Sequence, residues 1–363
     1  MEQQALIALS HKELLRVDHD YAGAATAAHL RYVADSEAGI LRVKKGAGYS
    51  YVYGGKPVKD KKELDRIRRL AIPPSWTSVW ICAHDRGHIQ ATGLDLRGRK
   101  QYRYHSLWNS LRSETKFHRL YEFGKALPAL RQRIAADLAT RGLSQEKVLA
   151  TVVSLMERTY IRVGNSEYEK SNGSYGLTTL KNKHVEVKGD KIVFSFNGKK
   201  GIHHDITLHN KRLARIVGQC LDIPGKELFQ YLEEDGTRRC IDSGMVNSYI
   251  RHAAEPDFTA KDFRTWAGSL HALQSFRAVG EAATATEAKK NLLTVLGSVS
   301  KKLGNTRTVC KKYYVHPALL RLYEEGKLVK YLHELDGLEA DVDRDEVGLT
   351  GEERVLMKIL KKY

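Results

Sequence analysis

Residues 184–209 read HVEVKGDKIVFSFNGKKGIHHDITLH, and apolar and polar side chains alternate along them. A Gly-Asp pair separates the first two alternating runs, and Asn197-Gly198 follows the second run. Asn-Gly between alternating runs is the strongest short-range signal for a hairpin, because both residues tolerate positive φ. The stretch therefore predicts a three-stranded β-island, with Lys199 at the start of its third strand.

Helical patterns flank this island. The segment SQEKVLATVVSLMERTYI, residues 144–161, places four side chains along one helical face: Val148, Val152, Leu155 and Thr159. In ALPALRQRIAADLATRG, residues 126–142, the proline predicts that a helix starts nearby, because proline is favoured in a first helical turn. We therefore expect residues 109–363 to form a mainly helical domain around the island.

The N-terminal part has a different pattern. Residues 30–105 contain aromatic and β-branched runs broken by glycines, such as GYSYVYGG, TSVWICA and KQYRYH. The run KKELDRIRRLAI predicts a helix that Pro73-Pro74 stop, because proline has no N–H to donate. These patterns predict an α+β protein, in which a small β-rich domain over residues 1–108 is joined near residue 110 to the helical domain.

The chain of 363 residues carries a formal net charge of +17, and the charge is unevenly distributed. Residues 334–353, the acidic segment, hold nine acidic residues and one arginine, so the remainder is more basic than the total indicates. An excess of positive charge attracts polyanions, and DNA and RNA are the first candidates. A ribosomal protein or a merely solubilising basic surface would show the same charge.

Cysteine spacing and hydropathy exclude several classes of protein. Four cysteines lie far apart without C-x-x-C spacing: Cys82, Cys220, Cys240 and Cys310. We therefore expect neither a zinc knuckle nor a disulfide framework, which suits a reducing cytoplasm. The start MEQQALIALSHKELL lacks the basic and apolar regions of a secretory signal, and no apolar run reaches the roughly 18 residues of a membrane span.

Motifs for nucleotide or metal binding are incomplete. GLDLRGRK (residues 93–100) lacks the Lys-Ser/Thr ending of a phosphate-binding loop, and GAGYSY (46–51) lacks the third glycine of a dinucleotide fold. The histidines of HDRGH (84–88) lie in a strand-like setting, and neighbours in HHD (203–205) point to opposite faces, which argues against a shared metal. We expect no nucleotide cofactor and no metal.

Two arginines occupy positions that suit contact with an anion. Arg162 lies at the predicted helix end TYIRVGN. Arg264 lies in TAKDFRTWAG, in the second turn of a helix that Thr259 and Asp262 are expected to cap. Gly268 shares its helical face, where a glycine lets DNA or another backbone approach closely. A single arginine at a helix end is more often a surface residue or a carbonyl cap.

The segment LGNTRTVCKKYYVHP, residues 303–317, joins two predicted helices. Gly304 ends the first helix and Pro317 opens the second. Between them lie the adjacent tyrosines Tyr313 and Tyr314. Such a pair more often anchors packing than supplies a nucleophile, so the combination and order of these motifs carry the argument.

Together these motifs resemble those of the type IB DNA topoisomerases of the compact poxviral and bacterial kind, and more distantly those of the tyrosine recombinases. The resemblance runs from about residue 35 to 325, through YIRVGN, GLTTLKNKHVEV, KDFRTWAG and LGNTRTVCKKYY. In the N-terminal part, GRKQYRYH resembles the DNA-contacting strand of the family. Motifs of this length and order are highly specific, so we expect relaxation of supercoiled duplex DNA by transient single-strand cleavage and religation.

The resemblance implies a role for each reactive residue. Arg162 and Arg264 would clamp the scissile phosphate, because guanidinium groups donate paired hydrogen bonds and stay charged. Lys199 would act as the general acid that protonates the departing 5′-oxygen, assisted by Arg162. Tyr314 would be the nucleophile and would end as a 3′-phosphotyrosyl ester. Since that ester stores the energy of the broken bond, no ATP is needed, and the side-chain cations make Mg²⁺ dispensable.

One position departs from the family pattern. The family usually has a histidine nine residues before the nucleophile, and here that position is Asn305. The same spacing selects Tyr314 over Tyr313. A neutral amide can donate to a non-bridging oxygen but cannot carry a charge or move a proton, so we expect a hydrogen-bonding role only.

The resemblance also implies contacts with the DNA partner. It places four residues at the duplex: Gln101, Tyr102, Tyr104 and Tyr168. We expect a monomer whose two domains form a clamp around duplex DNA, in the cytoplasm and associated with the nucleoid, with no membrane partner.

Two other readings share part of the pattern. Tyrosine recombinases use the same attack, but they usually have a histidine three residues before the second arginine, where this chain has Lys261. Their N-terminal domains are also usually helical. A catalytically silent DNA-binding protein would be equally basic but need not keep all four reactive groups. The pattern favours a topoisomerase over both.

Overall fold

The computed structural model describes residues 20–46, 48–233, 235–254, 257–338 and 347–363. The chain divides into two compact units, residues 1–119 (unit 1) and 120–363 (unit 2). Their junction lies inside one long helix, α4 (Ser106–Ala139). The protein is α+β, with a β-rich first unit and a largely helical second unit. None of the described helices is both long and apolar enough to cross a membrane.

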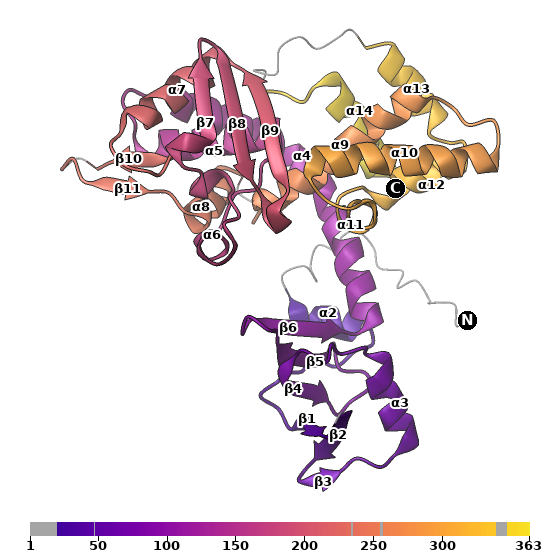
Figure 1. The fold of residues 1–363 in the computed structure, drawn as a ribbon. Coiled ribbons are helices and arrows are strands. Elements are labelled where there is room, and N and C mark those ends of the chain that lie inside the picture. The colour runs from indigo at the N-terminus through magenta and orange to yellow at the C-terminus, as the bar shows by residue number, and fades with distance from the viewer. Residues whose placement is uncertain (1–19, 47, 234, 255–256, 339–346) are drawn as a thin grey trace. The chain divides into compact units, whose positions relative to one another are not determined.

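Unit 1 is built on one six-stranded antiparallel sheet with the order β3-β2-β1-β4-β5-β6 (Figure 1). Its strands are β1 (Gly39–Lys45), β2 (Gly48–Tyr53), β3 (Lys56–Pro57), β4 (Thr77–Cys82), β5 (Ile89–Leu94) and β6 (Lys100–Tyr104). The runs GYSYVYGG, TSVWICA and KQYRYH form β2, β4 and β6, which confirms those predicted strands.

Two short helices accompany this sheet. Asp60 caps α3 (Lys61–Arg69) by accepting a hydrogen bond from the Lys62 N–H at 3.1 Å. The helix ends before Pro73-Pro74, as predicted, and Ile67 is buried with apolar residues of β1, β4 and β5. The other helix, α2 (Tyr21–Ala27), packs its alanines against the first turns of α4.

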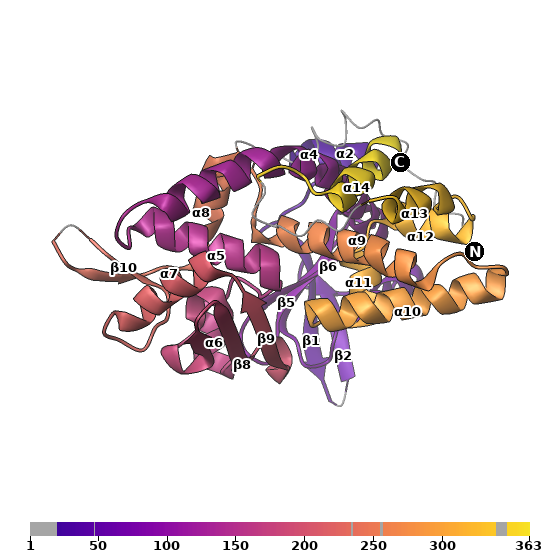
Figure 2. The ribbon, with the colours of Figure 1, turned by 90° about the horizontal axis from the view of Figure 1, so that it is seen from above.

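Unit 2 surrounds one large hydrophobic core. Besides the rest of α4, its helices are α5 (Gln145–Thr159), α6 (Ser166–Asn172), α7 (Lys211–Asp222), α8 (Ser243–Ala254), α9 (Ala260–Val279), α10 (Ala285–Leu303), α11 (Arg307–Tyr313), α12 (Pro317–Glu324), α13 (Val329–Asp336) and α14 (Gly351–Lys362). The long helices α9 and α10 lie side by side in both ribbon views (Figures 1 and 2).

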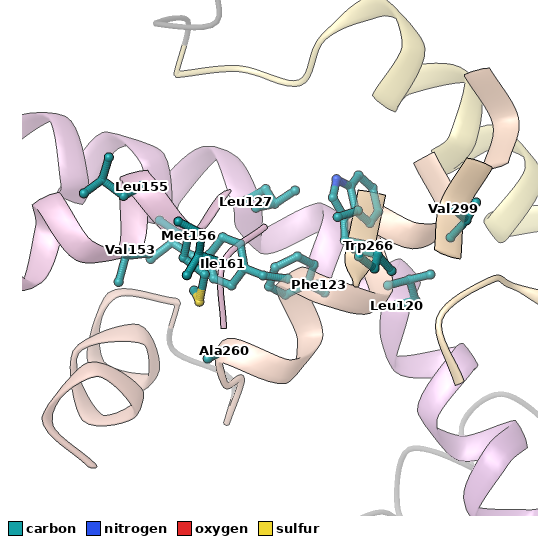
Figure 3. Close-up of a cluster of buried hydrophobic side chains, with 14 of the residues drawn as sticks. Leu120, Phe123, Leu127, Val153, Leu155, Met156, Ile161, Ala260, Trp266 and Val299 are labelled. Carbon is teal, nitrogen blue, oxygen red and sulfur yellow. The ribbon is translucent and has the colours of Figure 1, made fainter. Parts of the chain in front are cut away.

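Pro128 does not start a helix, as the sequence pattern suggested, but lies inside α4. A proline in a helix interior costs about 3 kcal/mol, because one backbone hydrogen bond is lost. The helix continues because its apolar stripe is buried on both sides of the proline, where Leu127 and Leu130 are fully buried. The ring of Phe123 also meets Trp266 edge-on (Figure 3). Burial of three such side chains contributes roughly 1.5–3 kcal/mol each, which outweighs the loss.

Helix α5 is buried on nearly every side, which its one-sided sequence pattern did not indicate. The predicted stripe of Val148, Val152 and Leu155 is buried, and so are Ala150 and Val153 on other faces. The reason is that α7, α8 and α9 all pack around α5. The segment that begins at Tyr160 therefore follows a helix whose position is fixed by packing in the core of unit 2.

Strands β7 (Val185–Lys188), β8 (Lys191–Asn197) and β9 (His203–His209) form the predicted island. The second turn is wider than predicted. Asn197 pairs with His203, so Lys199 lies in the connecting 3-10 turn (Lys199–Gly201) and not at the start of β9. The φ of Gly198 is −91°, so the backbone there does not require glycine. A side chain at position 198 would meet the His204 ring at 2.6 Å, and this close contact is what excludes one.

A second hairpin was not predicted from the sequence. It consists of β10 (Gln230–Leu232) and β11 (Arg238–Cys240), which pair antiparallel over three residues each. Strands this short contain too few residues to show an alternating pattern.

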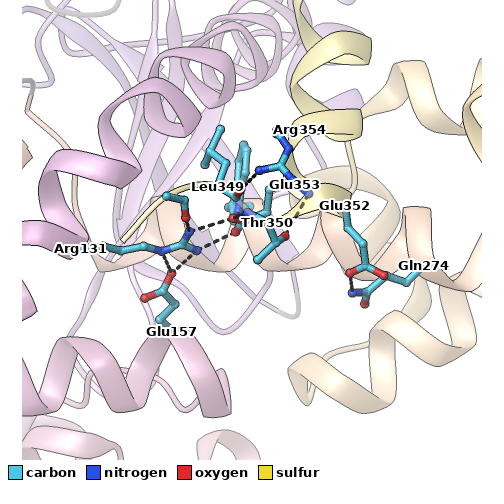
Figure 4. A network of polar contacts seen from close by, with 10 residues as sticks. Arg131, Glu157, Gln274, Leu349, Thr350, Glu352, Glu353 and Arg354 are labelled. Atoms are coloured by element: carbon cyan, nitrogen blue, oxygen red, sulfur yellow. Dashed lines mark hydrogen bonds and ion pairs between the residues drawn. The ribbon is translucent and has the colours of Figure 1, made fainter. Parts of the chain in front are cut away.

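A buried ionic network joins the C-terminal helix to the core (Figure 4). Arg131 of α4 donates from all five of its N–H groups, to Glu157, to Glu353 and to the Gly348 carbonyl. Glu353 also accepts from the Trp266 indole at 3.1 Å. Burial opposes the charge on Arg131, but the two carboxylates outweigh burial and raise the pKa of Arg131. Burial likewise opposes the charge on Glu353, and Arg131 nevertheless lowers its pKa.

The described parts of the acidic segment also bind basic side chains. Glu334 pairs with Lys358, and Asp336 pairs with Arg277 at 2.8 Å. Residues 339–346 of the segment lie outside the described residues. Acidic side chains at both ends of the segment therefore form ion pairs with basic side chains of unit 2.

Glu353→Ala is expected to lower the free energy of unfolding by about 3 kcal/mol, because it removes one carboxylate from a guanidinium that stays buried. Thermal unfolding of the purified protein measures this as a lower Tm. Glu352→Ala is the matched control, since that neighbouring carboxylate accepts from Gln274 at a less buried position, and its expected effect is below about 0.5 kcal/mol. Equal losses in the two variants would contradict the importance of the network.

Candidate active site

The first candidate cation follows helix α5. The helix ends at Thr159, and Tyr160 adopts a left-handed conformation with φ of 60°. Arg162 therefore lies in the segment beyond the helix and not at its end. Its Nη2 donates to the Gly304 carbonyl and to Asn305 Oδ1, both at 3.0 Å. These bonds tie Arg162 to the loop between α10 and α11.

The second cation, Arg264, lies in the second turn of α9. The start of this helix is capped as predicted, since the Thr259 N–H donates to the Asp262 carboxylate at 2.8 Å. The side chain is buried, with the residue only 6% exposed. Its Nη1 donates to the Tyr160 carbonyl at 2.5 Å and its Nη2 to the Leu303 carbonyl at 2.7 Å. Its Nε is buried without a hydrogen-bond acceptor in the described part of the chain.

Among the described residues, the backbone acceptors of these two cations are carbonyls at helix ends, and no carboxylate accepts from them. Tyr160 is the C-cap of α5, Leu303 is the last residue of α10, and Gly304 is its C-cap. Carbonyls at a helix C-terminus lack intrahelical partners and carry partial negative charge. They stabilise a guanidinium by hydrogen bonding without neutralising it.

The charge in the site is therefore only partly compensated. Burial and then repulsion from Arg264 lower the pKa of Arg162 to about 10. Burial also lowers the pKa of Arg264, although the nearby Tyr314 hydroxyl opposes this shift. Arg131, which binds two carboxylates, shows the opposite shift. A site of this kind favours an anionic ligand.

Tyr314 lies beside Arg264. It follows the last residue of α11 as its C-cap, and the centroid of its ring is 5.3 Å from Arg264 Cζ. Tyr313, the alternative tyrosine, is 40% exposed, and its ring packs against Lys312. The fold thus brings Tyr314 next to the buried cations, whereas Tyr313 faces solvent.

Gly268 of α9 permits this approach. A Cβ at position 268 would lie 2.4 Å from the Tyr314 carbonyl oxygen and 2.9 Å from its Cβ. Ser269 adds two bonds, since its hydroxyl donates to the Tyr314 carbonyl at 3.3 Å and accepts from the His316 N–H at 3.0 Å. The close backbone approach suggested by the sequence is made by Tyr314 itself.

Asn305 completes the group. It follows Gly304, which ends α10 in a left-handed conformation, as predicted. While Oδ1 accepts from Arg162, Nδ2 donates to the Leu303 carbonyl at 3.3 Å. An amide nitrogen carries a second N–H that can still bind a ligand. Asn305 therefore also orients Arg162, a contact that the sequence did not predict.

Lys199 is placed differently from the other candidates. It is exposed on the 3-10 turn, whereas Arg162, Asn305 and Tyr314 are partly buried. The turn reaches the cluster through His204, whose ring lies against Gly198 and also against Gly304.

Two residues near the cations were missed by sequence reasoning. His204 was considered only as a metal ligand, although its position opposite the inward-facing Phe196 on the neighbouring strand could have placed it inside. Cys310, one turn before Tyr314, is fully buried. Burial raises the pKa of its thiol to about 11 despite both arginines, so the thiol stays protonated.

Within the described residues, no three His, Cys, Asp or Glu side chains are arranged to hold a metal ion. The positive charge at this site comes from arginine side chains.

The candidate DNA-contacting residues lie on exposed surfaces of each unit. Tyr102 and Tyr104 share one face of β6, and their exposed rings stack with centroids 5.7 Å apart. Strand alternation puts Gln101 on the opposite face, where its amide donates to Asp95 at 3.0 Å. Tyr168 is exposed on α6 of unit 2. Exposed aromatic rings suit contact with nucleic acid, while Gln101 already has a protein partner.

Sequence comparisons match both units. The family described as eukaryotic DNA topoisomerase I, catalytic core, matches residues 105–338, and bacterial DNA topoisomerase IB, N-terminal domain, matches residues 48–95. DNA topoisomerase 1B of Acanthamoeba polyphaga mimivirus is 32% identical over 296 residues, which cover 79% of this chain and 88% of the relative. DNA topoisomerase 1B of Vaccinia virus (strain Copenhagen) is 25% identical over 279 residues, which cover 73% of this chain and 83% of the relative. These matches favour the topoisomerase interpretation over the recombinase alternative.

Gly268→Ala is expected to destabilise the protein by about 1–3 kcal/mol, because the added methyl group overlaps the Tyr314 backbone. Thermal unfolding measures the change as a lower Tm. Gly218→Ala on α7 is the matched control: a Cβ there meets no atom within 4 Å, so helix propensity should raise stability by up to about 1 kcal/mol. A Gly268→Ala protein as stable as the wild type would show that the backbone contact is looser than described.

Proposed function

Because the chain belongs to the type IB DNA topoisomerase family, we propose that it relaxes supercoiled duplex DNA by cutting one strand with Tyr314 and resealing it. The Tyr314 oxygen bonds to phosphorus, the bond from phosphorus to the 5′-oxygen breaks, and a 3′-phosphotyrosyl ester remains. The freed 5′ end rotates under torsion and then attacks the ester in the reverse reaction. Since the ester conserves the energy of the broken bond, neither ATP nor another cofactor enters the cycle.

The observation that carries this proposal is a pair of guanidinium groups, buried Arg264 and partly buried Arg162, that donate to helix-end carbonyls. A buried charge that lacks a counter-ion is costly, and a bound phosphate would supply the missing negative charge. Arg264 Nε, which has no hydrogen-bond partner among the described residues, is a further buried donor beside this charge. The Tyr314 ring beside Arg264 brings a hydroxyl nucleophile to the same place.

The remaining roles follow from the charges that develop during the reaction. Arg162 and Arg264 donate to the non-bridging oxygens, where negative charge grows in the five-coordinate transition state. Asn305 contributes one neutral hydrogen bond. Lys199 gives its proton to the departing 5′-oxygen, assisted by Arg162, while the proton of the Tyr314 hydroxyl passes to water. Because side-chain cations neutralise the phosphate, Mg²⁺ is dispensable.

DNA binding would involve both units. In this proposal Tyr102, Tyr104 and Gln101 contact the duplex from unit 1, Tyr168 contacts it from unit 2, and the two units close on it as a clamp. The net charge of +17 supports strong, salt-dependent attraction to the phosphate backbone. We place the enzyme as a monomer on the nucleoid in a reducing cytoplasm, in keeping with its four free cysteines.

Wild-type protein should relax supercoiled plasmid of either sign in EDTA without ATP, and Tyr314→Phe should abolish relaxation because it removes the nucleophilic oxygen. Tyr313→Phe is the matched control and should keep activity, since that ring is exposed to solvent. Agarose gels separate the topoisomers. Activity in Tyr314→Phe, or a covalent complex carrying the 5′ end of an end-labelled duplex, would contradict the proposal.

Loss of either arginine should slow single-turnover cleavage of a duplex oligonucleotide by about 100–1,000-fold, as expected for a donor to a transition-state oxyanion. Asn305→Ala should slow it by only about tenfold, which corresponds to one neutral hydrogen bond. Arg277→Ala, whose guanidinium pairs with Asp336, is the charge-matched control and should cleave at the wild-type rate. Asn305→Ala as damaging as Arg264→Ala would show that the amide does more than donate one bond.

A further inference from the structure

His204 lies where two parts of the active site meet. It stands on β9 opposite Phe196 of β8, and the two rings stack with centroids 5.2 Å apart. Phe196 is buried in the core of unit 2, so the imidazole rests on a rigid support. The position of this ring is therefore fixed by the island and not by the exposed turn beside it.

The imidazole is flanked by two glycines, each next to a residue with a proposed role. A Cβ at Gly198, which precedes Lys199, would lie 2.6 Å from His204 Cδ2 and Nε2. A Cβ at Gly304, which precedes Asn305, would lie 2.8 Å from His204 Cε1. The ring thus fills the space between the turn and the loop that binds Arg162.

The turn itself has few internal restraints. Its backbone bonds run from the Gly198 N–H to the Ile202 carbonyl at 2.8 Å and from the Gly201 N–H to the Gly198 carbonyl at 3.1 Å. Lys200 within it has a positive φ of 64°, which is unfavourable for a residue with a side chain. Since the Lys199 side chain is exposed, packing around it does not fix the turn. The His204 ring, which lies against Gly198, packs on this turn from outside it.

The imidazole is also suited to this place by its charge. Burial, Arg162 and Arg264 all lower the pKa of His204, and His203 adds to them while Asp205 opposes. A neutral ring can pack between the cations and the turn without repelling either arginine. A lysine or arginine at position 204 would add a further positive charge to a site that already holds two.

We infer that His204 is a positioning residue, which holds the Lys199 turn against the Gly304–Asn305 loop so that the Lys199 ammonium reaches the departing 5′-oxygen. This inference rests on the proposed function, in which Lys199 is the general acid. Loss of the ring should impair the proton transfer to the leaving group and leave the attack of Tyr314 and the phosphate contacts intact. A displacement of about 1 Å at a catalytic group can cost about 100-fold in rate.

The test compares two duplex oligonucleotides in single-turnover cleavage. In one, the scissile 5′-bridging atom is oxygen; in the other it is sulfur, which leaves as a thiolate and needs no general acid. His204→Ala should cleave the oxygen duplex about 10–100-fold more slowly than the wild type, and the sulfur duplex within about threefold of the wild-type rate. Gly198→Ala should show the same pattern, because its methyl group displaces the ring while the φ of −91° accepts alanine.

His203→Ala is the matched control. The neighbouring ring is exposed and contacts Ser195, Asn197 and Asp205, so this variant should cleave both duplexes at wild-type rates. Duplex affinity in a Tyr314→Phe background should be equal for His203→Ala, His204→Ala and the unaltered background. A loss of affinity confined to His204→Ala would assign the residue to DNA binding and overturn the inference.

Lys199→Ala separates failure of the inference from failure of the proposed function. If sulfur restores Lys199→Ala but not His204→Ala, or if His204→Ala cleaves the oxygen duplex normally, the positioning role is overturned and the acid role stands. If sulfur does not restore Lys199→Ala, the acid role fails and the inference fails with it. Restoration of both variants by sulfur supports the inference.

Discussion

The geometry of the candidate site in unit 2 depends on two guanidinium groups, buried Arg264 and partly buried Arg162, that donate to helix-end carbonyls. Arg162 and Arg264 donate hydrogen bonds to carbonyl oxygens at the C-terminal ends of α5 and α10. These carbonyls can accept from the arginines because Tyr160 and Gly304 end their helices in left-handed conformations, which leaves the last carbonyls without intrahelical partners. Partial charges at helix ends stabilise the cations without forming ion pairs, so the positive charge that the proposed phosphate contact requires is retained.

Arg131 shows what the same side chain does when carboxylates surround it. Its two glutamate partners satisfy its charge and all its N–H groups, and they raise its pKa. That arrangement fastens α14 to the core and leaves no donor for a ligand (Figure 4). The difference between a structural arginine and a candidate catalytic arginine thus lies in the charge of the acceptors around it.

Three glycines give the candidate site its shape, two through a close contact alone and one through a close contact combined with a positive φ. Gly268 allows the Tyr314 backbone to contact α9, and Gly198 allows the His204 ring to contact the Lys199 turn. Gly304 combines a positive φ with a close contact to the same ring. A methyl group at any of the three would displace a proposed functional residue, although none of the glycines touches substrate in the proposed reaction.

The sequence by itself determined the elements and the residue types of the site. Alternation gave β7–β9, the capping pair gave the start of α9, and the glycine and proline around residues 303–317 gave the helix ends, because each of these signals is local in the chain. The long motifs also identified the family. Tertiary structure alone decided that α4 runs through Pro128, that Lys199 lies in a wider turn, and that Tyr314 lies beside Arg264. It also decided that the His204 ring lies between the Lys199 turn and the Gly304–Asn305 loop, and that helix-end carbonyls accept from the two arginines. These outcomes come from contacts between residues far apart in the chain, whose energies outweigh local preference and which no spacing pattern records.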